Sequence, residues 1–172
     1  ISNARFVNPF EMDPLDAIKL CKDALKLLKG DLRDFFTSKG IAVEAELLVK
    51  KGGKKNNNHA LKLFDKIINH KKAPPYFRGR AMVGKAELIL HFGVDSLSRG
   101  LKLCGDTLAI FVDRPHDYFA IKARVVEAEF LSRRGASSDL YTAEAICKKI
   151  IVNPMSHKDL VARAKLVLAE IS

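Results

Sequence analysis

The sequence has no tryptophan, only three cysteines, and no apolar run close to the length that crosses a bilayer. A membrane-spanning helix needs about 20 consecutive apolar residues, so we expect no membrane span. The start, Ile1 to Phe10, also lacks the apolar stretch of a secretory signal. These absences predict an intracellular, cytoplasmic protein, with the nucleus as the alternative location.

The first residues do not look like part of a fold. Ile1 to Ala4 resembles the remnant of a cleaved purification tag, and we assign residues 1–12 to this remnant and an N-terminal extension. A length of 172 residues suits one domain or about four stacked helical hairpins. We expect one domain over residues 13–172, and the start at Ile1 rather than a methionine suggests a fragment of a longer protein.

Signatures of catalysis and of metal binding are missing as well. No H-E-x-x-H, G-x-S-x-G, Walker or dinucleotide-binding pattern occurs. No two cysteines stand at the spacing of zinc ligands, and the five histidines are scattered singly. We therefore expect no enzyme activity, no metal and no cofactor. A site assembled from distant residues is the alternative that one sequence leaves open.

Strands are not predicted, because no segment alternates apolar and polar residues over the length of a strand. Hydrophobic residues make up 48% of the chain and charged residues 29%, which is typical of a folded protein rather than a disordered one. The formal net charge is +10. Unless the lysines only form a solvated face, this charge favours acidic proteins, nucleic acid or anionic membranes as partners.

What the sequence does contain is an internal repeat. Three segments align without gaps: VEAELLVKKG (43–52), GKAELILHFG (84–93) and VEAEFLSRRG (126–135). Each has Ala-Glu, two large apolar residues, three variable residues and a final glycine, and the glycines recur at intervals of roughly 40 residues. A looser fourth copy, RAKLVLAEIS (163–172), places Ala164 in the alanine position.

A second class of segment alternates with the first: AIKLCKDAL (17–25), ALKLFDKII (60–68), GLKLCGDTL (100–108) and AEAICKKII (143–151). Each copy opens with a small residue, and apolar residues follow at steps of three and four, as on one face of an amphipathic helix. One position of this pattern holds Cys21, Phe64, Cys104 and Cys147. We expect that position to be core, and the cysteines to be packing residues.

Caps, prolines and glycines divide the periodic pattern into helices. Gly52, Gly93 and Gly135 stand where the C-terminus of a helix favours a left-handed residue. The sequence predicts eight helices, near residues 13–29, 32–51, 58–70, 75–92, 95–111, 116–134, 138–152 and 156–171. The predicted fold class is therefore all-α.

Together the two helix types resemble the tetratricopeptide repeat family over residues 13–172. The small first-helix residue and the turn glycine of that family are matched by Ala45, Ala86, Ala128, Gly52, Gly93 and Gly135. The small second-helix residue and the closing proline are matched by Ala60, Gly100, Ala143, Pro74, Pro115 and Pro154. The chain departs from the family in its longer spacing, its lack of tryptophan and its cysteines at an aromatic position. The resemblance implies a right-handed α-solenoid of antiparallel helix pairs with a concave groove, and a protein-protein interaction scaffold or adaptor.

The resemblance also places the first helices of the repeats along the groove. A basic, apolar, acidic, basic pattern recurs before each turn glycine, and we assign a partner-binding wall to Lys39, Glu46, Lys50, Arg80, Val83, Glu87, His91, Lys122, Val125, Glu129 and Arg133. Such a wall would hold a peptide or helix of another protein. Alternatively, each glutamate only pairs with the basic residue four positions later on its own helix. The glutamates fit poorly to the carboxylate clamp of chaperone-binding family members.

Lysines also cluster outside this wall. The stretch Lys50 to Asn58 predicts a flexible inter-helix loop. It is either solvated or part of an anion-binding basic patch made of Lys51, Lys54, Lys55, Lys71 and Lys72. The last helix is apolar on more than one face, which predicts either a chain that continues or self-association through that helix.

Two further functions compete with the scaffold. A nucleic-acid-binding helical repeat is motivated by the net charge, but a glutamate in every full repeat interrupts the basic stripe that phosphates favour. A structural subunit of a larger assembly would suit the apolar last helix. The leading expectation is a scaffold for another protein, with no cofactor. If the net positive charge selects the partner, that partner is acidic.

Overall fold

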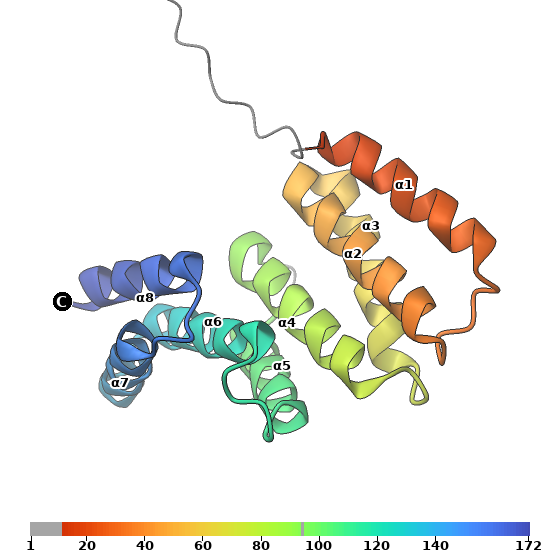
Figure 1. The fold of residues 1–172 in the computed structure, drawn as a ribbon. Coiled ribbons are helices and arrows are strands. Elements are labelled where there is room, and N and C mark those ends of the chain that lie inside the picture. The colour runs from red at the N-terminus through yellow and green to blue at the C-terminus, as the bar shows by residue number, and fades with distance from the viewer. Residues whose placement is uncertain (1–11, 94) are drawn as a thin grey trace, which may run out of the picture.

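The structure, a computed structural model, describes residues 12–93 and 95–172, and the predicted tag remnant and most of the extension lie outside them. Within these ranges the chain forms eight α-helices and no strand, which confirms the all-α prediction. The helices are α1 (Pro14–Leu27), α2 (Phe35–Lys51), α3 (Lys54–Asn69), α4 (Pro75–Phe92), α5 (Leu97–Ile110), α6 (Tyr118–Arg134), α7 (Ser137–Val152) and α8 (Lys158–Ile171) (Figure 1). Each predicted helix is present, with its ends shifted by at most four residues.

The helices stack in two layers. Every helix packs on its neighbours in sequence, and α2, α4, α6 and α8 also contact one another in succession. In the described part of the chain, α1, α3, α5 and α7 make no such contacts among themselves. The even-numbered helices therefore form the tighter, inner layer of a curved solenoid-like stack, and the odd-numbered helices form its outer layer (Figure 1).

Three glycines end the inner helices as the sequence predicts. Gly52, Gly93 and Gly135 have φ angles of 76°, 60° and 73°, in the region that side chains with a Cβ avoid. The amide of each donates a hydrogen bond to the carbonyl four residues earlier, which satisfies one of the free carbonyls at the helix end. These turns send the chain from an inner helix to the outer helix that follows it.

The predicted flexible loop at Lys50 to Asn58 is wrong. Only Gly52 and Gly53 break the chain, with φ angles of 76° and 90°, and α3 begins at Lys54. The side-chain amide of Asn56 donates to the carbonyl of Gly52 at 2.6 Å, and Asn57 is buried. Two consecutive glycines make the turn by themselves, so the polar residues after them are free to join the helix.

The core confirms the packing position that the repeat predicts in three of its four copies, whereas Cys21 in α1 is only half-buried. Phe64, Cys104 and Cys147 are fully buried at the same place in α3, α5 and α7. Small residues let the helices approach closely, and a Cβ on Gly100 would lie 2.1 Å from the ring of Phe130 on α6. No helix in the described ranges is long and apolar enough to cross a membrane.

Candidate functional site

The predicted wall lies on the inner layer, but its glutamates do not pair locally. The Glu46 carboxylate accepts two hydrogen bonds from the guanidinium of Arg80, both at 2.6 Å. Glu46 belongs to α2 and Arg80 to α4, so this pair joins two successive inner helices. The alternative in which Glu46 binds Lys50 on its own helix is therefore wrong.

The same link continues along the layer as a network of four charges. Glu87 of α4 binds Lys122 of α6 at 2.7 Å and Arg163 of α8 at 2.6 Å. The guanidinium of Arg163 also makes two hydrogen bonds with Glu129 of α6, at 2.9 and 2.7 Å. The alternating charges that the sequence predicts as a binding surface thus connect each inner helix to the next.

The environment keeps these groups ionised. Burial alone would raise the pKa of Glu87, but Lys122 and Arg163 outweigh it and hold that pKa below its ordinary value. Burial would lower the pKa of Arg163, but its hydrogen bonds and the charges of Glu129 and Glu87 raise it further above the ordinary value. Three carboxylates face three cations in these links, so they leave no net charge for a partner.

The wall residues outside these pairs are basic or histidine. Lys39, Lys50, His91 and Arg133 are exposed on the inner helices. The guanidinium of Arg133 donates to the carbonyl of Leu90, which ties its position to α4. Because the glutamates are neutralised within the chain, the accessible charge of the wall is positive.

Val83 and Val125 do not belong to the wall, and that prediction is wrong. Both side chains have no exposed area. Val83 is part of the core cluster that contains Cys104, and Val125 is part of the cluster that contains Cys147. The side chain ten positions before each of these turn glycines therefore faces the outer helix that follows, and a partner cannot reach it.

The predicted basic patch is two groups rather than one. Lys51 at the end of α2 and Lys54 and Lys55 at the start of α3 are exposed, whereas Lys71 and Lys72 lie beyond the other end of α3. A helix of 16 residues is about 24 Å long, so the two groups cannot hold one small anion together. The patch prediction is wrong because the stretch from Lys54 is helix, not a prong.

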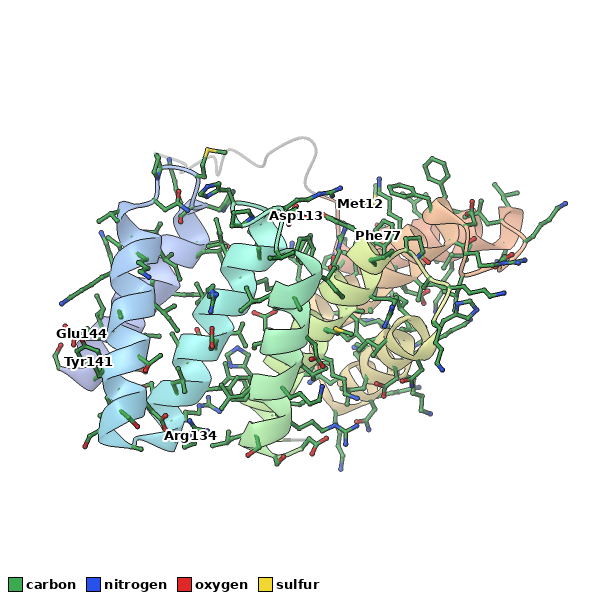
Figure 2. All side chains as sticks on the ribbon, turned by 90° about the horizontal axis from the view of Figure 1, so that it is seen from below. Met12, Phe77, Asp113, Arg134, Tyr141 and Glu144 are labelled. Atoms are coloured by element: carbon green, nitrogen blue, oxygen red, sulfur yellow. The ribbon has the colours of Figure 1, made fainter. Side chains whose placement is uncertain are left out.

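Sequence reasoning missed a chain of aromatic rings across the inner helices. Consecutive rings lie edge to face with centroids 4.9 to 6.0 Å apart, in the order Phe36, Phe35, Phe77, Tyr76, Phe119, Tyr118 and His157. We call this chain the aromatic ridge. In Figure 2, Phe77 lies near the upper ends of the helices, and Arg134 near the end of α6 lies at their lower ends.

The ridge has a signal in the sequence. Adjacent aromatic residues stand at the same distance before each turn glycine: Phe35 and Phe36, Tyr76 and Phe77, Tyr118 and Phe119. The inner helices bring these pairs together because they lie side by side and run in one direction. The guanidinium of Arg80 lies 4.7 Å from the centroid of the Phe119 ring, so the ion pairs and the ridge meet. Phe35, Phe36 and Tyr118 are exposed.

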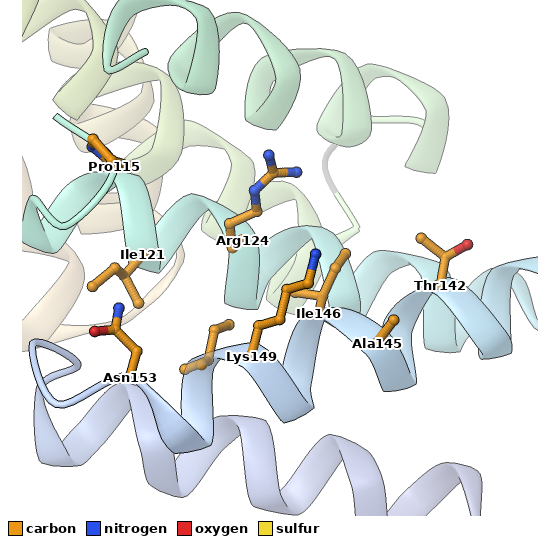
Figure 3. A pocket seen from close by; sticks show the side chains of 9 residues that line it. Pro115, Ile121, Arg124, Thr142, Ala145, Ile146, Lys149 and Asn153 are labelled. Carbon is orange, nitrogen blue, oxygen red and sulfur yellow. The ribbon is translucent and has the colours of Figure 1, made fainter. Parts of the chain in front are cut away.

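A separate cleft of about 360 Å³ lies between α6 and α7 (Figure 3). Ile121, Ile146 and Ile150 contribute apolar surface, and Arg124 and Lys149 stand beside it. Arg124 is already bound to Glu127 at 3.0 Å. None of the residues predicted for a site lies in this cleft.

The thiols of the two innermost cysteines are held in their protonated form. Burial raises the pKa of Cys104 to about 12 and that of Cys147 to about 11. Across residues 12–93 and 95–172, no group of three or more potential ligand side chains is placed to hold a metal ion. No family model, curated protein or solved structure matches this chain.

Proposed function

We propose that this chain is a tetratricopeptide-like scaffold that binds an acidic segment of another protein along its inner helices. One observation carries the proposal: the ion pairs between helices consume Glu46, Glu87 and Glu129, so the exposed charge of the wall is positive. An acidic partner would meet Lys50 and Arg133 without facing an opposing carboxylate.

The aromatic ridge supports the same partner class. Exposed aromatic residues beside cations are typical of binding surfaces, because rings supply apolar area and little entropy is lost on ordering them. Phe35 and Tyr118 would take apolar side chains of the partner while the wall cations take its carboxylates. The four inner helices span roughly 30 Å, which is the reach of about nine extended residues.

A nucleic-acid-binding repeat is the second candidate. The glutamates that spoke against it are neutralised within the chain, and the formal net charge of +10 favours phosphates. Against it, the lysines beside α3 are split between its two ends, whereas a strand of nucleic acid favours a continuous basic groove. We therefore place it second.

The test reverses the exposed wall charges and leaves the ion pairs intact. The wall variant is Lys50→Glu, His91→Glu and Arg133→Glu, all at exposed positions. The matched control is Lys62→Glu, Lys66→Gln and Lys149→Glu, exposed residues of the outer helices α3 and α7. With histidine counted as neutral, both variants lower the formal net charge by the same amount. An effect of net charge alone would therefore change the recovery of bound proteins equally in both.

Each protein is immobilised and exposed to a nuclease-treated lysate, and bound proteins are quantified. We expect proteins rich in acidic segments to be recovered at least tenfold less by the wall variant than by wild type or the control. Equal recovery of these proteins by wild type, wall variant and control would overturn the proposal. So would a parallel experiment with untreated lysate in which nucleic acid is the only material recovered. Circular dichroism before the experiment shows that the variants remain helical.

A further inference from the structure

Within the described residues, the N-terminal end of the solenoid leaves a seat for a helix uncovered. α1 is an outer helix and, among the described helices, contacts only α2. Its Cys21 is half-buried, whereas the residues at the same place in α3, α5 and α7 are fully buried. A groove of about 480 Å³ opens there, lined among others by Cys21, Ala24, Leu25, Phe36, Gly40 and Val43.

Comparison with the next repeat shows what this seat accepts. Phe36 corresponds to Phe77 and Gly40 to Ala81, counted back from the turn glycines. Phe77 and Ala81 are buried in the core that α2 and α3 share with α4, but Phe36 is 62% exposed. The α1–α2 groove is therefore shaped like the place that an inner helix occupies elsewhere in the stack.

The charge at this seat points the same way. Lys39 occupies the position of Arg80 and Lys122, and each of those binds a glutamate from the preceding inner helix. Lys39 is exposed and makes no ion pair within the described ranges. The missing occupant is thus an inner-type helix that carries a glutamate in the pairing position.

The C-terminal helix α8 has those features. Arg163 occupies on α8 the place of Lys122 on α6, because each binds the glutamate of the inner helix before it. In this register, Ala169 and Glu170 correspond to Ala128 and Glu129. The sequence alignment that put Ala164 in the alanine position is therefore wrong by five residues. Glu170 is exposed and has no ion pair in the part of the chain described.

Within the described ranges, the face of α8 that corresponds to the covered face of α6 is open. Leu166 corresponds to Val125, which has no exposed area, yet Leu166 is 64% exposed. Ala169 is exposed where Ala128 is fully buried. Among the described helices, α1 is an outer helix with no inner helix packed before it, and α8 is an inner helix with no outer helix packed after it.

We infer that copies of this chain associate head to tail, with α8 of one copy seated in the α1–α2 groove of the next. Leu166 and Ala169 of one copy pack against Cys21 and Leu25 of the next, and its Glu170 binds the other copy's Lys39. The contact repeats the α6–α8 packing already present in the chain. Because the two surfaces differ, the association is heterologous and produces rings or open filaments.

The experiment uses the purified 172-residue protein without any partner, so its result is independent of the proposed function. Light scattering and sedimentation measure the mass from about 5 to 500 µM, a range that covers weak association. We expect the wild-type mass to rise with concentration. Lys39→Glu and Glu170→Lys should each weaken association at least tenfold, since each places like charges together, and the double variant should restore it. Lys22→Glu, an exposed residue of α1 outside the groove, is the matched control.

Labelling of Cys21 by a thiol reagent gives a second readout. Its rate in the wild type should fall as the protein concentration rises, and the fall should be absent in Lys39→Glu. A mass that stays monomeric at every concentration overturns the inference, whether Cys21 is open or is already protected by another part of the chain. The inference is also overturned if neither Lys39→Glu nor Glu170→Lys weakens association, or if the double variant does not restore it.

Discussion

Arg163 binds Glu129 through two hydrogen bonds of 2.9 and 2.7 Å that join α8 to α6. Its remaining terminal nitrogen reaches Glu87 of α4 at 2.6 Å. One guanidinium thus links the last inner helix to the two before it, through a planar, five-donor fork that a lysine does not have. The inner layer is held by pairs between residues far apart in sequence as well as by its apolar core.

Replacing Arg163 by methionine should lower the free energy of unfolding by roughly 3 kcal/mol, because Glu129 is left without a cation in a mostly shielded site. The two side chains are 24% and 18% exposed, so the loss stays below that of a fully buried pair. Arg163→Lys keeps the charge but not the planar fork, and it should lower the free energy of unfolding by about 1 kcal/mol. Urea unfolding measures both, and equal stability of all three proteins would show that the pair contributes nothing.

The low pKa of Glu87 predicts how this contribution changes with pH. A carboxylate whose pKa is lower in the folded state stabilises the fold above its unfolded pKa, near 4.5, and the contribution is lost as the pH falls through the folded pKa. Glu87→Gln should therefore be less stable than wild type at pH 7, and the difference should shrink below about pH 4.5.

Urea unfolding at intervals from pH 7 to pH 3 measures that difference. Glu144→Gln is the control, because Glu144 pairs with Lys148 on the surface of α7 and surface pairs contribute little. Its difference from wild type should stay small throughout. A Glu87→Gln difference that is constant or grows toward acid would contradict the assignment.

The helices could be predicted because their signals are local. Apolar spacing, caps and a glycine such as Gly93 act within a few residues, and the ends of the eight helices follow from them. The Gly52-Gly53 turn shows the limit of such signals, since the polar stretch after it reads as a loop and folds as the first turn of α3. A polar composition does not determine the backbone conformation there.

The partners of the wall residues could not be predicted, because they depend on how far successive helices shift along one another. Glu46 has Lys50 one turn away on its own helix, yet it binds Arg80 on the next inner helix. Which face of a helix is covered depends equally on the stack, so Val83 reads as surface and is core. Only the placement of α8 shows that Arg163 continues the pattern.

Gly100 should not tolerate alanine. A Cβ there would meet the Phe130 ring at 2.1 Å, and that ring has no exposed area into which it could move. We expect Gly100→Ala to lower the free energy of unfolding by about 2 kcal/mol. Gly105→Ala in the same helix has nothing within 4 Å and should raise it by up to about 1 kcal/mol. Thermal unfolding compares them, and two shifts of the same sign would contradict the close approach of α5 and α6.

The three cysteines should separate into one accessible thiol and two shielded ones. Thiol reagents attack the thiolate, and burial raises the pKa of Cys104 to about 12 and of Cys147 to about 11. Burial and the charge of Glu44 also raise the pKa of Cys21, but its side chain is only half-buried, so at pH 8 and low micromolar concentration one thiol per chain should react faster than the other two. The other two should react at least 100-fold more slowly, as local opening allows. A colorimetric thiol assay measures the phases, and three free thiols should react in denaturant. Cys21→Ala should remove the fast phase. A fast phase that survives this substitution would mean that α5 or α7 is not packed as described.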